Sequence, residues 1–353
     1  MRRSLVRFFG LLVIAALALP ALAAGAAGAA PSTNKLASAT LNGDGSTFQL
    51  GYNQVVIGAF KPVQKAVTIT YQGVGSGQGR TDFVNKVVDF AGTDALYKST
   101  DPQPPAPFFY FPTVSAPITV SYNLSGVKGL KLSPDTIAKI FEAQITTWND
   151  PAIKADNPKL KLPSTSITVV HRTDGSGTTA NFTSYLVKAA GSAWTLGTGS
   201  TVQWSSSTQG GKGNTGVATL VKSTDGAIGY VDFSDANASA LTVAAVKNAA
   251  GKFIVPNLAS TQAAVNAAVV QPNLTYDPLN AAGKGAYPIA SPTYVLVYKT
   301  QAANNTGKAM VAFLNYIYGD GQKLAASVDY ARLPAKLLKQ AKAQVKQIVV
   351  PAS

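Results

Sequence analysis

The stretch VVHRTDGSGTTANFTSYL, residues 169–186, predicts a strand, a tight turn and a helix in direct succession. An apolar run ends at Val170, and apolar residues recur at helical spacing from Phe182 to Leu186. Between these segments, Gly175 and Gly177 permit a tight turn. A strand that passes through a glycine-rich turn into a helix is typical of α/β proteins, so this stretch indicates that class.

The first turn of the predicted helix is a candidate anion site. The first amides of a helix have no internal partner and carry its partial positive charge, so Ser176, Gly177 and Thr178 are expected to offer convergent donors to an oxyanion. Arg172 can supply the countercharge, and Asp174 is close enough in sequence to brace its guanidinium. The same residues are also compatible with an ordinary turn in which a threonine is the N-cap of the helix. The lysine of a P-loop is missing, which argues against a nucleoside triphosphate ligand.

Two more glycine-rich turns precede predicted helices. Gly43–Phe48 follows a short strand, and Gly73–Gly79 follows an alternating, β-branched strand at 67–71. Each turn carries a hydroxyl residue near the expected first helical turn, so the three helix starts suggest convergence on one ligand. The alternative is that an α/β protein needs many such turns for its connections alone. A short strand then leaves Asp94 at another turn, where its carboxylate could be structural.

Composition describes a basic, exported protein. The 353 residues are 46% apolar, which is enough for a large core in two lobes or domains. Three arginines precede an apolar run at 8–19 and small residues follow, so residues 1–30 are predicted to be a signal peptide that is cleaved on export. The formal charge of +14 falls to +11 without those arginines. Four lysines between 336 and 346 are expected on the solvated side of a helix, with docking on an acidic surface as the alternative.

The sequence lacks the residues that most enzyme active sites and metal sites require. The absence of cysteine excludes disulfides, thiolate metal sites and a lipid-modified N-terminal cysteine. His171 is the only histidine and Glu142 the only glutamate, and no Gly-x-Ser-x-Gly motif surrounds a candidate serine nucleophile. His171 is therefore expected to pack at a strand end. No catalytic residue, metal or cofactor is predicted.

Five motifs together carry a resemblance to a known family. They are Gly43–Phe48, Tyr71–Gly77, Val88–Ala95, Arg172–Thr178 and Gly210–Val217. In order and spacing, they resemble the extracytoplasmic phosphate-binding protein of the high-affinity phosphate ABC transporter. The resemblance spans most of the chain after the signal peptide.

The resemblance implies an α/β, periplasmic-binding-protein-like fold of type II, in which two lobes joined by a two-crossing hinge close on the ligand. Lobe 1 would comprise residues 31–116 with 292–353, and lobe 2 residues 117–291. The phosphate ligands would be Thr47, Phe48, Ser76, Asp94, Arg172, Ser176, Gly177 and Thr178, with Asp174 supporting the arginine. The protein would deliver inorganic phosphate to a membrane-embedded ABC permease, bind no nucleic acid, and act as a monomer in the periplasm or another extracytoplasmic space.

The resemblance gives the carboxylate of Asp94 a specific expected role. An ionised carboxylate only accepts hydrogen bonds, so it tolerates an anion that brings a proton, as hydrogen phosphate does and sulfate does not. Ser46 and Gln49 depart from the alanine and proline usual near Thr47, and neither is expected to remove an amide donor from the Thr47–Phe48 step. The alternatives are a binding protein for another oxyanion, an exported phosphohydrolase, and an envelope-associated surface-binding protein.

Overall fold

The structure is a computed structural model that describes residues 35–352. The predicted signal peptide, residues 1–30, lies outside the described residues. From Lys35 onward the chain forms one compact unit in which strands and helices are interspersed. Among the helices of residues 35–352, none combines the length and the hydropathy that a membrane span requires.

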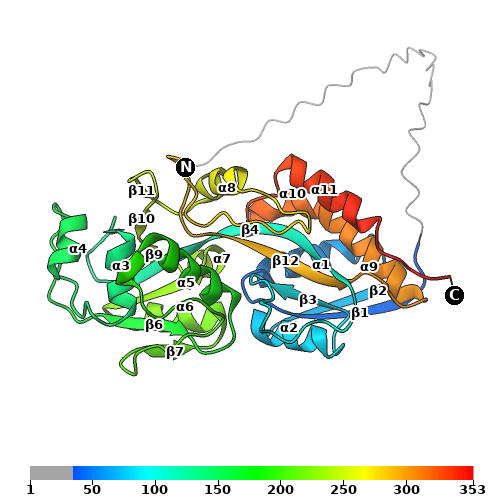
Figure 1. Ribbon diagram of the computed structural model, residues 1–353, viewed down its shortest axis with the longest axis horizontal. Helices are drawn as coiled ribbons and strands as arrows, with labels where there is room; N and C mark the ends of the chain where they lie inside the picture. The colour runs from blue at the N-terminus through cyan, green and yellow to red at the C-terminus, as the bar shows by residue number, and fades with distance from the viewer. Residues whose placement is uncertain (1–34, 353) are drawn as a thin grey trace, which may run out of the picture. The chain divides into compact units, whose positions relative to one another are not determined.

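One nine-stranded sheet organises the described chain (Figure 1). Its order is β2-β1-β3-β12-β4-β8-β6-β7, and β9 pairs with β4. The strands are β1 (Ala39–Gly45), β2 (Val67–Gly73), β3 (Phe90–Thr93), β4 (Phe108–Asn123), β6 (Thr168–Arg172), β7 (Gln209–Gly211), β8 (Ala227–Asp232), β9 (Thr242–Val243) and β12 (Ala290–Tyr298). A separate three-stranded sheet joins β11 (Phe253–Ile254), β10 (Ala245–Lys247) and β5 (Lys131–Leu132).

The large sheet has two sections that share the long strand β4. The first section contains β2, β1, β3 and β12, and the second contains β8, β9, β6 and β7. Residues 108–117 pair with β12, whereas residues 118–123 pair with β8. Two prolines lie within this strand although proline cannot donate to a ladder. Pro112 pairs next to the register shift between Pro292 and Tyr294, and Pro117 is where β4 changes partner. The division into residues 31–116 with 292–353 and 117–291, which would place one crossing next to Pro117, stays a prediction.

Helices pack against both sections of the sheet. They are α1 (Leu50–Phe60), α2 (Ser76–Val84), α3 (Pro134–Phe141), α4 (Pro151–Asp156), α5 (Gly177–Ala189), α6 (Gly213–Ser223), α7 (Phe233–Ala238), α8 (Leu258–Ala267), α9 (Asn305–Tyr316), α10 (Gln322–Leu324) and α11 (Ala335–Val345). Figure 1 shows α2 on one side of β1 to β3, and α9 and α11 on the other. In the second section, the ring of Phe182 on α5 stacks on that of Tyr230 on β8, with centroids 4.5 Å apart. This stacking fixes the position of α5 relative to the strands of the second section.

The three predicted strand-turn-helix units are confirmed as β1 with α1, β2 with α2, and β6 with α5. The spacing of apolar residues also predicts helices at about 305–318 and 321–330, and two helical stretches are found there. The first is α9, the second is α10 with a 3₁₀ turn at Ala325–Val328, and a π-turn at Ile317–Gly321 with a kink joins them. Gly319 absorbs the change in direction with non-helical backbone angles. The predicted helix at 335–347 is confirmed as α11.

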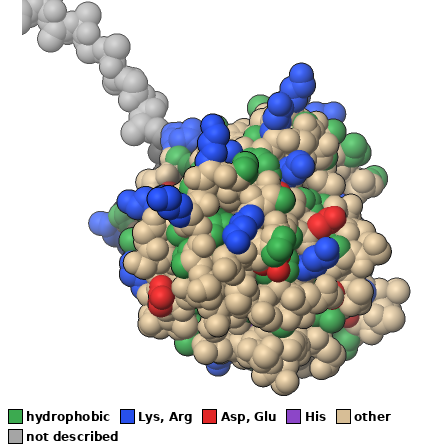
Figure 2. Space-filling view, turned by 90° about the vertical axis from the view of Figure 1, so that its left-hand side faces the viewer, with side chains coloured by type: hydrophobic (Ala, Val, Ile, Leu, Met, Phe, Trp, Pro, Cys, Tyr) green, Lys and Arg blue, Asp and Glu red, His purple; other side chains and the backbone are tan. Residues whose placement is uncertain are grey.

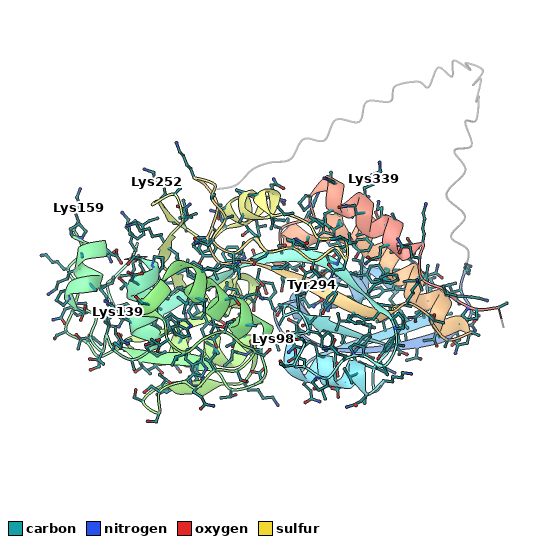
Figure 3. The ribbon with its side chains drawn as sticks, in the orientation of Figure 1. Lys98, Lys139, Lys159, Lys252, Tyr294 and Lys339 are labelled. Carbon is teal, nitrogen blue, oxygen red and sulfur yellow. The ribbon has the colours of Figure 1, made fainter. Side chains whose placement is uncertain are left out.

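Lysines are spread over the surface and form no dense run. Those of α11 are exposed while Leu337, Ala341 and Val345 are buried, which confirms the solvated helix face. At the end of the second section, Lys139, Lys159 and Lys252 are exposed and extend outward (Figure 3). Figure 2 looks onto this end and shows more lysine and arginine than acidic side chains on it. Exposed lysines therefore lie on both sections of the described chain.

The carboxyl ends of parallel strands meet where the two sections face each other. β1 runs parallel to β2 and β3, and β6 runs parallel to β7 and β8. The turns that follow these strands lead into α1, α2, α5 and α6, so four helix N-termini point toward one region. Direct contact between the sections includes the Gly77 amide donating to the Gly175 carbonyl at 2.7 Å.

Gly45 ends β1 in a conformation that only glycine adopts readily. Its φ is +121°, and a Cβ there would lie 2.2 Å from the Gly92 carbonyl oxygen. We expect Gly45→Ala to lower the free energy of unfolding by more than about 1 kcal/mol, because both the backbone angle and the contact are unfavourable.

The matched control is Gly58→Ala in α1, where nothing lies within 4 Å of the added methyl. This change is expected to raise the free energy of unfolding by about 0.5–1 kcal/mol, because alanine favours a helix interior. Denaturant titration measures both. Equal effects of the two substitutions would contradict the assignment of the β1 turn.

Candidate functional site

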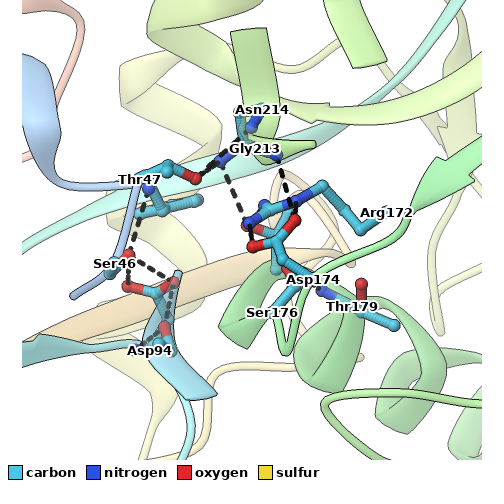
Figure 4. Close-up of polar contacts among 12 residues, drawn as sticks. Ser46, Thr47, Asp94, Arg172, Asp174, Ser176, Thr179, Gly213 and Asn214 are labelled. Carbon is cyan, nitrogen blue, oxygen red and sulfur yellow. Dashed lines mark hydrogen bonds and ion pairs between the residues drawn. The ribbon is translucent and has the colours of Figure 1, made fainter. Parts of the chain in front are cut away.

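The candidate site lies where the turns after β1, β3 and β6 approach the N-termini of α5 and α6 (Figure 4). Sequence-distant residues meet there. Thr47 on the turn after β1 contacts Asn214 on α6, and Asn181 on α5 donates to the Asp94 carbonyl at 2.7 Å. The two sections of the sheet thus both contribute to the site.

Arg172 is held at the end of β6 by a carboxylate and two hydroxyl groups. Its Nε donates to Asp174 Oδ1 at 2.8 Å, and its Nη2 donates to Asp174 Oδ2. Its remaining terminal nitrogen donates to Thr178 Oγ1, and its amide donates to the hydroxyl of Tyr230. Only 4% of Arg172 is exposed. A buried guanidinium with one fixed carboxylate partner presents its other edge to the site.

Asp174 braces the arginine, as the sequence predicted, and also reaches α6. Its Oδ1 accepts from the Gly213 amide at 3.0 Å. Burial alone would raise the pKa of Asp174, but the hydrogen bonds and charge of Arg172, together with the Gly213 amide, outweigh burial and lower that pKa. Asp174 is therefore the ionised partner that keeps Arg172 in place.

Two threonine hydroxyl groups are oriented by the side-chain amide of Asn214. Its Nδ2 donates to Thr47 Oγ1 at 3.1 Å and to Thr178 Oγ1 at 3.2 Å. Thr47 Oγ1 also accepts from the Asn214 backbone amide, and Thr178 Oγ1 from Arg172. A hydroxyl oxygen has two lone pairs, so both oxygens are fully used as acceptors and each hydroxyl proton is left to donate.

The start of α5 differs in part from the predicted anion seat. The Ser176 amide donates to the Ser200 carbonyl at 2.9 Å, so the expectation of a free Ser176 amide is wrong. The Ser176 hydroxyl is the N-cap and accepts from the Thr179 amide. The amides of Gly177 and Thr178 occupy the first two helical positions, which have no intrahelical acceptor. A Cβ on Gly177 would lie 2.5 Å from Ser76 Oγ, so only glycine fits here.

Asp94 is a buried carboxylate surrounded by hydroxyl groups. Ser46 Oγ lies 2.7 Å from each carboxylate oxygen, Thr293 Oγ1 lies 2.5 Å from Oδ1, and Ser76 Oγ lies 3.3 Å from Oδ2. Only 3% of Asp94 is exposed. Burial raises the pKa of Asp94 to about 6, although the hydroxyl groups of Thr293, Ser46 and Ser76 and the charge of Arg172 oppose that rise. The group is ionised at neutral pH and protonated in mild acid.

Phe48 does not offer the free amide expected of it. Its N–H donates to Ser46 Oγ at 3.0 Å. The physical reason is the serine hydroxyl two residues earlier, which lies within reach of the amide and was given no role from the sequence. The side chain of Phe48 is buried against Tyr330 in the core.

A cavity of about 630 Å³ adjoins Asp94 and Gly175 between the two sections. Arg80, Lys98 and Tyr294 are among the residues that line it, and Figure 3 labels the last two. Two of these side chains connect the sections: Arg80 donates to Ser200 Oγ, and Lys98 donates to the Thr198 carbonyl. The candidate site is thus enclosed on one side by polar contacts that must break before the sections can separate.

Other candidate chemistry finds little support around the site. His171 packs at the end of β6 as expected, with its ring stacked on Trp204 at 5.0 Å, and burial lowers its pKa. In the part of the chain that the structure describes, no cluster of three histidine or carboxylate side chains could hold a metal ion. The arrangement instead suits a tetrahedral oxyanion, with donors on most sides and one carboxylate acceptor.

Sequence reasoning missed four residues that complete the site. Asn214 follows a glycine-rich turn that was noted only as a motif, and Ser46 and Gln49 were regarded as minor departures. Thr293 lies 199 residues from its partner Asp94, so no local pattern points to it. Gln49 contacts Asp94 only through Thr293, to which its Nε2 donates at 2.7 Å.

Comparisons with known proteins agree on one family. Residues 29–320 match the family model of the PBP superfamily domain. The phosphate-binding protein PstS of Haemophilus influenzae is 37% identical over 284 residues, which cover 79% of this chain and 84% of that protein.

Solved structures show the same fold. A high-affinity periplasmic phosphate-binding protein (PfluDING) bound with phosphate has a TM-score of 0.71 and 22% identity, over 86% of this chain and 93% of that one. An ABC-type phosphate transport receptor from Vibrio cholerae has a TM-score of 0.55 and 18% identity, over 83% and 100%. The predicted fold class, α/β and periplasmic-binding-protein-like, is confirmed.

The raised pKa of Asp94 predicts how stability depends on pH in the absence of an anion. The folded protein binds a proton at Asp94 up to about pH 6, whereas the ordinary value is 3.8, so the free energy of unfolding falls as pH rises between these values. We expect this fall to be smaller in Asp94→Asn, by up to about 3 kcal/mol. Denaturant titrations at a series of pH values measure the difference. Parallel stability curves for the two proteins would contradict the burial of an ionisable Asp94.

Proposed function

Because the chain belongs to the PBP superfamily, and within it to the PstS phosphate-binding proteins, we propose that it captures inorganic phosphate and delivers it to a membrane-embedded ABC permease for import. The carrying observation is the buried Asp94 carboxylate, which faces the same site as Arg172 and several hydroxyl donors. The relatives described above are binding proteins and a transport receptor, and this supports a role without catalysis.

The proposed phosphate ligands come from both sections of the sheet. Asp94 accepts a hydrogen bond from the protonated oxygen of the anion, and Arg172 supplies positive charge. The donors are the hydroxyl groups of Thr47, Ser176 and Thr178 with the amides of Gly177 and Thr178. The hydroxyl of Ser76 has one proton, which it gives either to the anion or to Asp94 Oδ2, 3.3 Å away. Phe48 acts through Ser46, because its amide is already donated to that hydroxyl.

The geometry of the Thr47 and Thr178 hydroxyl groups supports this assignment, because each has its proton and no free lone pair left for the ligand. Asn214 fills the lone pairs of Thr47 and shares those of Thr178 with Arg172. An anion is all acceptor apart from its own protons, so such a site matches it without any rearrangement of hydrogen bonds.

Asp94 makes the site selective for an anion that carries a proton. Hydrogen phosphate can donate a hydrogen bond to the carboxylate, whereas sulfate would place two acceptors against each other at a buried group. Unpaired buried polar groups discriminate strongly between otherwise similar ligands. The same device disfavours any fully ionised oxyanion.

Capture and release require the two sections to separate. The contacts of Arg80 with Ser200 and of Lys98 with Thr198 lie at the cavity and are among those that opening would break. We infer that the protein works as a monomer outside the cytoplasm, after export through the signal peptide predicted at residues 1–30, and without a lipid anchor on cysteine. The positive net charge supports attraction of phosphate over distance.

Calorimetry tests the proposed function on protein that has been unfolded, freed of ligand and refolded. Phosphate is expected to bind saturably at one site, and sulfate to give no comparable binding. In Asp94→Asn the preference for phosphate is expected to fall by about 100-fold or more, because an amide can donate to sulfate.

The matched control is Asp225→Asn, which removes the same charge from an exposed turn. It is expected to leave the preference unchanged. An absence of phosphate binding by the wild-type protein would overturn the proposal. If Asp94→Asn still prefers phosphate to sulfate as strongly as wild type does, the Asp94 carboxylate does not determine the selectivity.

A further inference from the structure

The hydroxyl groups around Asp94 are themselves held by amide donors. Ser46 Oγ accepts from the Phe48 amide at 3.0 Å, and Thr293 Oγ1 accepts from Gln49 Nε2 at 2.7 Å. A hydroxyl that accepts from a fixed amide turns its own proton away from that amide. Both protons are then directed at the carboxylate, where Ser46 and Thr293 make the shortest contacts with Asp94.

The two chains of hydrogen bonds start from one turn. Ser46, Phe48 and Gln49 all lie between β1 and α1, and Ser46, Gln49 and Thr293 are buried with at most 1% exposure. Gln49 is fixed in turn by donation to the Tyr294 carbonyl and by acceptance from Asn53 Nδ2. Without Gln49, the Thr293 hydroxyl has a second acceptor available, because the Thr93 carbonyl lies 3.4 Å away.

We propose that Ser46 and the Gln49–Thr293 pair are positioning residues that keep Asp94 ionised and so set the pH at which the site stops requiring a protonated anion. The inference rests on the proposed function, because it concerns selection at the phosphate site. None of the three needs to contact the ligand. They act by favouring the ionised form of Asp94, which accepts a hydrogen bond from the ligand, over the neutral form, which donates one.

The physical argument is a competition between burial and hydrogen bonding. Burial favours the neutral carboxyl, and each hydroxyl donor favours the ionised form. The charged or titratable groups that act on Asp94 from packed elements are Arg172 on β6, Tyr71 on β2, and Tyr330 in the segment before α11. Burial holds the pKa of each tyrosine well above its ordinary value, so neither titrates near neutrality. Removal of a hydroxyl donor therefore shifts the titration of Asp94 upward.

A protonated Asp94 would reverse the selection. The neutral carboxyl donates a hydrogen bond, so sulfate would then find a donor where it otherwise meets an acceptor. Sulfate itself gains no proton in mild acid, and its binding as a function of pH therefore reports on the protein alone. Asp44 also titrates near neutrality, because burial and the neighbouring Asp82 raise its pKa to about 7. Comparison of variants at each pH removes that shared contribution.

The experiment measures sulfate and phosphate affinity by calorimetry from about pH 4.5 to pH 8 for wild type, Ser46→Ala and Thr293→Val. In wild type, sulfate binding is expected to strengthen as pH falls through the titration of Asp94. In both variants the midpoint should move up by about one pH unit, because a hydrogen bond to a charged group is lost. Gln49→Met should move it in the same direction by less.

Ser121→Ala is the matched control, since the hydroxyl of this buried β4 serine pairs with that of Thr119 rather than with Asp94. Its midpoint should equal that of wild type. A midpoint unchanged in Ser46→Ala and Thr293→Val, with phosphate still bound by wild type, would overturn the inference and leave the proposed function standing. A wild-type protein that binds no phosphate would overturn the proposed function itself. If one variant fails to fold, the other gives the same test.

Discussion

A buried carboxylate stays ionised only where donors and positive charge replace the water that it has lost. Asp94 meets this condition through the hydroxyl groups of Ser46, Ser76 and Thr293 and the charge of Arg172. The condition is met incompletely, since its pKa is still raised to about 6. Under the proposed function this incomplete compensation favours a protonated anion, because such an anion can donate a further hydrogen bond to the carboxylate.

The fold brings these groups together from positions far apart in the sequence. Parallel strands deliver their carboxyl ends to one edge, and β4 joins the two sections so that both edges face the same site. Arg172 is countered by Asp174 rather than by Asp94, so the two carboxylates have separate roles: one fixes the arginine, and the other is the proposed acceptor for the anion. Small residues such as Gly177 allow the sections to approach this closely.

The sequence was most informative where the signal was local. The strand-turn-helix units, the bracing of Arg172 by Asp174 and the packing role of His171 all depend on neighbouring residues, and the structure agrees. It was least informative where partners are distant, as for Thr293 with Asp94, or where a hydroxyl captures an amide, as Ser46 captures that of Phe48. Helix α8 was missed because its alanine-rich sequence gives little contrast between faces, although its capping box at Asn257 was a usable signal.

The most direct test of the account is a crystal structure of the protein with phosphate at neutral pH. The account predicts a phosphate oxygen about 2.5–2.7 Å from an Asp94 carboxylate oxygen, the distance of a hydrogen bond to an ionised acceptor. It also predicts that Arg172 contacts the same anion while it remains paired with Asp174. A phosphate bound elsewhere, or one that leaves Asp94 facing only its hydroxyl partners, would contradict it.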